Sequence, residues 1–159
     1  ASLYIKINML LNDSLAEKTI DTSDLFAIGQ MYEKINESEK ALNIYKTCFS
    51  SEELGGCELL KLCKNMAVLY RKQDNWNEAA KYWKISAELN DMESCIGLAK
   101  FNEHILRNIR EALGWVARAE SILHSSPIPL FKKKRLISEL ELRKQRLGRS
   151  VKNVQEEES

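Results

Sequence analysis

Apolar positions along the chain recur three, four and seven residues apart, in blocks that polar segments separate. Leu25, Ile28 and Tyr32 form one such stripe, and the polar segment 36–39 follows it before the next stripe begins at Ala41. This spacing places the apolar side chains on one face of a helix. The same alternation of stripe and polar break continues downstream. The sequence therefore predicts consecutive pairs of amphipathic helices.

One spacing recurs within these helix pairs: a large residue, an alanine nine or ten positions later, and a second large residue four positions after the alanine. Such spacing suits a ring packed against the gap that an alanine leaves on a neighbouring helix. The alanines are 38 and 33 residues apart. The residues are Tyr32, Ala41 and Tyr45 in the first pair, Tyr70, Ala79 and Trp83 in the second, and Asn102, Ala112 and Val116 in the third, where both aromatic residues are lost.

This period and its motif residues resemble the tetratricopeptide repeat, a helix–turn–helix unit of about 34 residues that buries its apolar face by stacking on its neighbours. The resemblance covers residues 22–123 and implies an all-α, right-handed helical solenoid of about three units. The third unit has a turn that is one residue longer, and the terminal proline of the repeat is absent from every unit. The quoted motifs are Ile28-Gly29-x-x-Tyr32 with Ala41, Tyr45 and Cys48, then Met66-Ala67-x-x-Tyr70 with Ala79, Trp83 and Ser86, then Leu98-Ala99-x-x-Asn102 with Ala112, Val116 and Ala119.

We expect one domain over residues 1–152, with an additional helix at each end of the repeats. Segment 2–11 is strongly apolar and predicts an N-terminal helix. Segment 128–148 follows Pro127 and predicts a capping helix, because a terminal repeat needs a cover with a polar outer face. The acidic residues 153–159 are expected to form a disordered tail.

The composition and charge of the chain indicate the cellular environment that we expect for it. The net charge of 159 residues is +1, and no apolar run approaches the roughly 20 residues that span a bilayer. The four cysteines form no C-x-x-C pair, so buried free thiols in a reducing cytoplasm are expected. We expect no membrane partner and no small-molecule substrate.

The sequence contains no recognisable catalytic or metal-binding pattern. His104 and His124 are 20 residues apart, and neither has a second ligand at helical spacing. No phosphate-binding loop or nucleophile motif is present. We therefore expect no cofactor, no metal and no catalytic residue, and we interpret the chain as a non-catalytic interaction module for a protein or peptide partner.

The resemblance implies a binding surface, because the first helix of each repeat lines the concave face of the solenoid. The second unit is basic there, which suits either a groove for an acidic peptide or a lysine-rich face that only meets solvent. Asn65 stands where repeats that clamp a terminal carboxylate have asparagine, but Phe26 and Gln30 replace their lysine and asparagine. The predicted contacts are Phe26, Gln30, Lys61, Lys64, Asn65, Val68, Arg71, Lys72 and Lys100.

Basic residues concentrate near the end of the chain. Between Leu130 and Val154 there are nine Lys or Arg and two Glu, a local charge of +7. Such a stripe is typical of a surface that contacts phosphates, and equally of the polar outer face of a capping helix. The candidate nucleic-acid contacts are Lys132, Lys133, Lys134, Arg135, Arg143, Lys144, Arg146 and Arg149.

A second resemblance gives this basic helix an alternative function. Part of the third unit resembles a repeat that follows a ribonuclease-H-like, DnaQ-type exonuclease domain in some bacterial proteins. The resemblance lies in the segment 98–104, the turn at 108–110 and Glu111-Ala112-Leu113. That resemblance implies an accessory C-terminal domain whose last helix contributes nucleic-acid contacts, with segment 2–11 as a remnant of the enzyme's final helix. The metal-binding carboxylate motifs of that family are absent, so the resemblance implies context and not activity.

Overall fold

A computed structural model of the chain describes residues 21–51 and 54–157, with the side chains described as far as residue 150. Within these residues it contains seven α-helices and no strand. The N-terminal helix expected over 2–11 lies outside the described residues. The helices are α2 (Thr22–Lys34), α3 (Ser38–Phe49), α4 (Gly56–Lys72), α5 (Trp76–Glu88), α6 (Met92–His104), α7 (Ile109–Ser125) and α8 (Leu130–Glu157).

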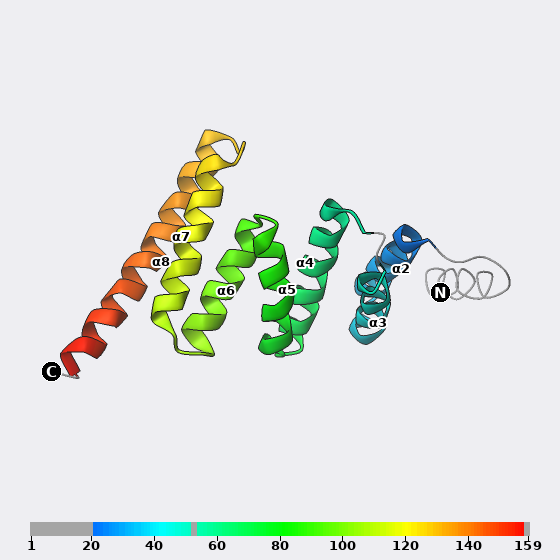
Figure 1. The fold of residues 1–159 in the computed structure, drawn as a ribbon, viewed down its shortest axis with the longest axis horizontal. Coiled ribbons are helices and arrows are strands. Elements are labelled where there is room, and N and C mark those ends of the chain that lie inside the picture. The colour runs from blue at the N-terminus through cyan, green and yellow to red at the C-terminus, as the bar shows by residue number, and fades with distance from the viewer. Residues whose placement is uncertain (1–20, 52–53, 158–159) are drawn as a thin grey trace.

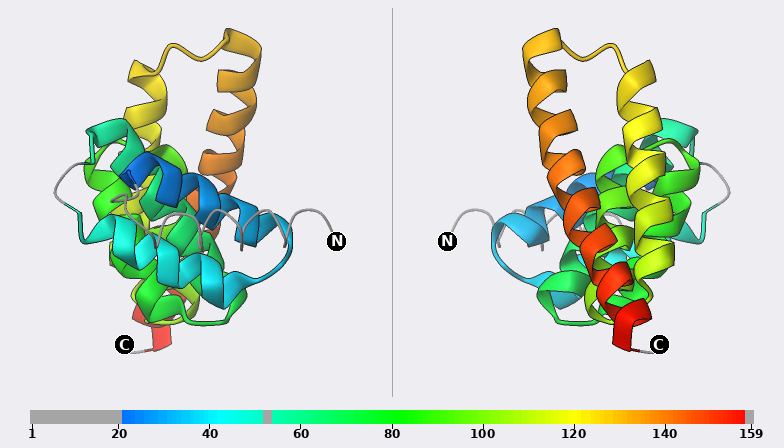
Figure 2. Two further views of the ribbon diagram at one scale, coloured as in Figure 1. Left: turned by 90° about the vertical axis from the view of Figure 1, so that its right-hand side faces the viewer. Right: turned by 90° about the vertical axis from the view of Figure 1, so that its left-hand side faces the viewer.

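The helices form a single row in which each packs on the one before it (Figure 1). The pairs α2–α3, α4–α5 and α6–α7 are the three helix–turn–helix units, and α8 packs antiparallel on α7 at the end of the row (Figure 2). The structure is therefore the all-α, right-handed solenoid with a C-terminal capping helix that the periodicity and the repeat resemblance predict.

The turns after α2, α4, α5 and α6 share one backbone feature. In the turn after α4, the amide of Asn75 donates to the carbonyl of Tyr70 at 2.9 Å, which closes the helix as a Schellman-type bond does. The turn of the third unit is one residue longer, as predicted, since α6 ends at His104 and α7 begins at Ile109. Each of these four turns places one residue in the left-handed region, which Asn and Asp tolerate well. These residues are Asn36, Asp74, Asn90 and Arg107, with φ between 55° and 61°.

The repeated motif residues form the core of the solenoid. The three motif alanines have no exposed surface, and every aromatic member is at most 8% exposed. Asn102, which replaces the aromatic residue of the third unit, is also buried, and its Nδ2 donates to the carbonyl of Leu98 at 2.9 Å. The third unit therefore keeps the packing of the repeat by satisfying a buried amide within its own helix.

The cysteines follow the predicted helix faces. Cys48, Cys63 and Cys95 are buried free thiols on the apolar faces of their helices, and Cys57 is exposed near the start of α4. Burial raises the pKa of each of the three buried thiols.

No helix in the described part of the chain combines the length and apolar character that a membrane span needs.

The last helix differs from its expected bounds. It begins at Leu130, directly after Pro129, and continues to Glu157 instead of ending at 148. Gly148 therefore lies inside the helix. A single glycine costs a helix about 1 kcal/mol relative to alanine. This cost is too small to end a helix that has good helix formers on both sides of the glycine.

Candidate partner-binding groove

A groove of about 370 Å³ opens between α4 and α6, the first helices of the second and third units. Four of the predicted contact residues line it together: Lys64, Val68 and Arg71 from α4, and Lys100 from α6. Val68 is 44% exposed, so an apolar side chain of α4 faces the opening. The remaining lining residues are Trp76 and Trp83 from α5 and Glu93, Ser94, Ile96 and Gly97 from α6.

The apolar part of the groove depends on the two tryptophans of α5. Trp83 is buried and lies against Gly97, where the missing side chain leaves room for the indole ring. The ring centroids of Trp76 and Trp83 are 6.1 Å apart. The guanidinium carbon of Arg71 lies 5.6 Å from the Trp76 ring centroid, a cation–π contact that holds this cation beside the groove.

At the end of the groove near the start of α6, Lys64 is already paired with carboxylates. Its Nζ donates to Oδ1 of Asp91 at 3.0 Å and lies 2.7 Å from Oε2 of Glu93. Asp91 also caps α6 by accepting the amide of Ser94 at 2.9 Å. Burial lowers the pKa of Lys64, but the two carboxylates outweigh burial, so the pKa is raised. Lys64 therefore joins the second unit to the third.

At the other end of the groove, the charge environment is positive. Burial lowers the pKa of Lys100, and the charges of Arg143 and Arg71 lower it further, while Glu103 opposes them. A lysine whose neighbours disfavour its charge gains stabilisation when an anion approaches. Arg71 and Lys100 are both exposed, so an anion can reach them.

The remaining predicted contact residues do not line this groove. Asn65 Nδ2 donates to the hydroxyl of Tyr45 at 3.2 Å, and that hydroxyl donates to Glu33 at 2.5 Å. The ring centroid of Phe26 lies 5.6 Å from that of Tyr45. Asn65 and Phe26 thus contact the core of the first unit. Gln30, Lys61 and Lys72 are exposed outside the groove.

The sequence prediction omits the groove residues that α5 contributes. Trp76 and Trp83 fall on the second helix of a unit, which the sequence pattern assigns to the core, and Glu93 lies in the first turn of α6. The signal that could have found Trp83 is Gly97, a glycine in mid-helix that makes room for a large ring from the preceding helix.

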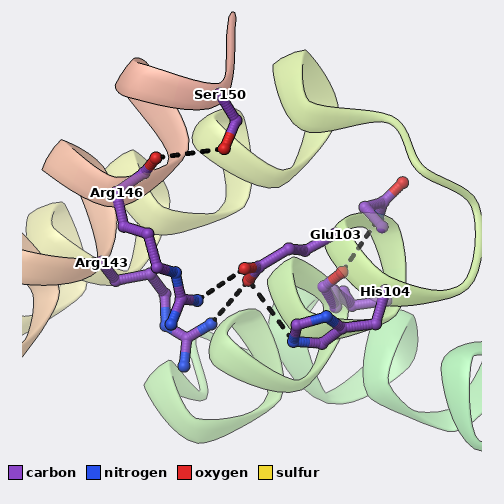
Figure 3. A network of polar contacts seen from close by, with 7 residues as sticks. Glu103, His104, Arg143, Arg146 and Ser150 are labelled. Carbon is purple, nitrogen blue, oxygen red and sulfur yellow. Dashed lines mark hydrogen bonds and ion pairs between the residues drawn. The ribbon is translucent and has the colours of Figure 1, made fainter. Parts of the chain in front are cut away.

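The basic residues of α8 mostly bond within the chain. Arg143 Nη1 and Arg146 Nη2 donate to the two oxygens of Glu103 in α6, at 2.9 and 2.6 Å (Figure 3). Lys144 donates to Glu120 of α7 at 2.8 Å. These ion pairs hold the capping helix on the last unit.

Two further candidates at the start of α8 are also engaged. Lys133 Nζ donates to the carbonyl of His124 at 2.6 Å, at the end of α7. Arg135 Nε donates to Glu139 at 3.0 Å, one turn along α8. The candidate cations that remain exposed without an ion pair on the described surface are Lys132, Lys134 and Arg149. The geometry favours the capping interpretation of α8.

Comparisons with known proteins agree with this architecture. The profile of the tetratricopeptide repeat family matches residues 62–90, which run from α4 through α5. A search of curated protein sequences gave no match. These findings support the repeat resemblance and give no support to the exonuclease resemblance.

Several solved structures share the fold. PcrH from Pseudomonas aeruginosa is similar with a TM-score of 0.63 and 12% identity, over 84% of this chain and 97% of that one. PcrH in complex with the chaperone binding region of PopD has a TM-score of 0.61 at 12% identity, over 80% and 91%. The C-terminal TPR-containing domain of a Plasmodium falciparum protein described as FK506-binding has a TM-score of 0.59 at 15% identity, over 85% and 91%. At this identity the likeness concerns the fold alone.

Proposed function

We propose that the chain is a non-catalytic interaction module whose groove between α4 and α6 binds an extended segment of a protein partner. The observation that carries this proposal is the groove itself, in which apolar side chains from three helices meet exposed cations. Peptide-binding surfaces commonly combine an apolar pocket for affinity with charged groups that select the sequence. The alternative interpretation, a lysine-rich face that only meets solvent, does not explain why tryptophan side chains line the groove.

The structural relatives support the same kind of function. PcrH has been solved with the chaperone binding region of PopD and with that of PopB. A repeat fold of this kind therefore holds segments of other proteins in at least one relative. For our chain, the groove lies between the first helices of two adjacent units, and Val68 and Ile96 both line it.

A display library of random peptides tests the proposal. Peptides enriched on the wild-type chain should lose about tenfold or more in affinity when Val68→Arg places a long charged side chain in the groove. Gln30→Arg is the matched control, since it adds the same group to an exposed position of α2 outside the groove. Circular dichroism on both variants checks that each is folded.

Two outcomes would reject the groove as the binding site: no peptide is enriched, or the enriched peptides bind Val68→Arg as well as they bind the wild type. A labelled single-stranded oligonucleotide serves as a second probe in the same assay. If it binds with an affinity that falls steeply with salt, and Lys132→Glu with Lys134→Glu removes that binding, the alternative function in nucleic-acid contact replaces the one proposed.

A further inference from the structure

We infer that the groove binds its peptide in one orientation, with an acidic side chain at the Arg71–Lys100 end and a large apolar side chain beside it over the tryptophans. The inference rests on the proposed function, because it names the chemistry of the ligand for the same groove. Its basis is the order of charged and apolar groups along α4 and α6.

The charged residues of the groove lie in matching positions on its two walls. Lys64 and Arg71 are seven residues apart on α4, and Glu93 and Lys100 are seven residues apart on α6. Seven residues of helix span about 10 Å, which is about three residues of extended peptide. Val68 and Ile96 lie between these charged ends. The groove therefore has a length suited to about three residues of an extended peptide, in which side chains two positions apart face the same side.

The two ends carry opposite excess charge. At one end, a single ammonium group, Lys64, faces the carboxylates of Asp91 and Glu93. A peptide carboxylate placed there would meet Glu93, which is exposed, and a cation that is already neutralised. That end is suited to a neutral or basic group.

At the opposite end, Glu103 of α6 is surrounded by cations. Glu103 is shared by Arg143 and Arg146 of α8 and lies 3.7 Å from His104 Nε2 (Figure 3). Arg71 and Lys100 add two positive charges to this end of the groove. The lowered pKa of Lys100, caused by burial and then by Arg143 and Arg71, is in keeping with this excess.

The capping helix takes part in this arrangement. Arg143 reaches Glu103 from α8 and thereby places its charge close enough to act on Lys100. The cations at this end thus come from three helices, α4, α6 and α8. An acidic peptide side chain bound there would be held by the repeat and by the cap together.

Sequencing of the enriched peptides gives the first test. On the wild type, Asp or Glu should be enriched within about three positions of a large apolar residue, in line with the span of the groove. Selection on Lys100→Gln should still enrich peptides and should lose this acidic preference. Lys72→Gln is the matched control, an exposed lysine of α4 outside the groove, and should keep it.

Binding of synthetic peptides gives the affinity. A fluorescein-labelled peptide with the enriched acidic residue should bind Lys100→Gln about tenfold or more weakly than the wild type, because a charge-assisted hydrogen bond is lost. The same peptide with Gln at that position should bind both proteins alike. A nitroxide placed next to the acidic residue should broaden the amide signals of Arg71 and Lys100 more strongly than those of Lys64 and Glu93.

The outcomes separate the two proposals. Enriched peptides that need Val68 but show no acidic preference would overturn the charge orientation and leave groove binding in place. Stronger broadening at Lys64 and Glu93 than at Arg71 and Lys100 would also overturn it. If no peptide is enriched at all, both the groove function and its orientation are wrong.

Discussion

Gly97 of α6 lies directly against the indole ring of Trp83 in α5, so that a Cβ at position 97 would be 2.6 Å from Cε2 of the ring. This contact joins the second unit to the third and brings the indole to the groove. A glycine in mid-helix costs about 1 kcal/mol in helix propensity, and here the close approach of a large aromatic ring offsets that cost. The stability of the packing between the second and third units and the shape of the groove thus depend on the same two residues.

This pair predicts that replacing a helical glycine by alanine destabilises the protein, which is the opposite of the usual effect in a helix. Gly97→Ala should lower the free energy of unfolding by about 1–3 kcal/mol, because the added methyl group forces the Trp83 ring to move. Gly114→Ala, in α7 with nothing near its added Cβ, should raise stability by up to about 1 kcal/mol. Urea denaturation of both variants measures the difference. Equal effects would show that helix propensity alone governs both positions.

Ser86 of α5 gives a prediction from an unsatisfied group. Its Oγ is buried and has no hydrogen-bond partner among the described residues. Burying a hydroxyl without a hydrogen bond carries a desolvation penalty, and replacing the hydroxyl by hydrogen removes it. Ser86→Ala should therefore leave stability unchanged or raise it by about 1 kcal/mol. Thermal unfolding followed by circular dichroism measures the change.

Ser94 is the matched control for that substitution. It is equally buried, but its Oγ donates to Asp91 at 2.7 Å. Ser94→Ala should therefore lower stability by about 1 kcal/mol or more, since a bond to a charged group is lost. If Ser86→Ala destabilises the protein as much as Ser94→Ala does, the Ser86 hydroxyl has a bonding partner in solution.

Glu103 holds the capping helix on the solenoid. Glu103→Gln removes the charge that Arg143 and Arg146 share, and should lower stability by about 1–3 kcal/mol, because the carboxylate side chain is only 11% exposed. Amide hydrogen exchange should accelerate in the part of α8 that contains the two arginines. Glu120→Gln is the control, because its partner among the described side chains, Lys144, is half exposed and such pairs contribute little. Equal exchange in both variants would contradict the assigned role.

The buried thiols predict a loss of stability at high pH. Burial raises the pKa of Cys63 from 9.0 to about 11. A thiol whose pKa is raised by folding favours the folded state fully below the unfolded pKa, and this contribution is lost as pH rises from about 9 to 11. The urea midpoint should fall over that range, and Cys63→Ala should make the fall shallower. An unchanged slope in the variant would show that other groups govern the alkaline loss.

Short-range patterns in the sequence account for most of the fold. The 3.6-residue periodicity fixed which faces of the helices are buried, and Asn36 and Asp74 mark turns whose backbone needs the left-handed region. The alanine spacing located residues with no exposed surface, such as Ala41 and Ala79. Each of these signals acts within a few residues of the chain, so it can be read without knowledge of the neighbours.

The site required the tertiary structure. Lys64 and Lys100 look alike in the sequence, each a lysine in the first helix of its unit, yet one is neutralised by Asp91 and Glu93 and the other lies among cations. The pairing of Arg143 with Glu103 spans 40 residues. By itself the sequence determined the helices, their buried faces and the repeat. Only the stacking of the units decided which charges are paired and which face the groove, because charge pairing depends on distances between helices that no local pattern encodes.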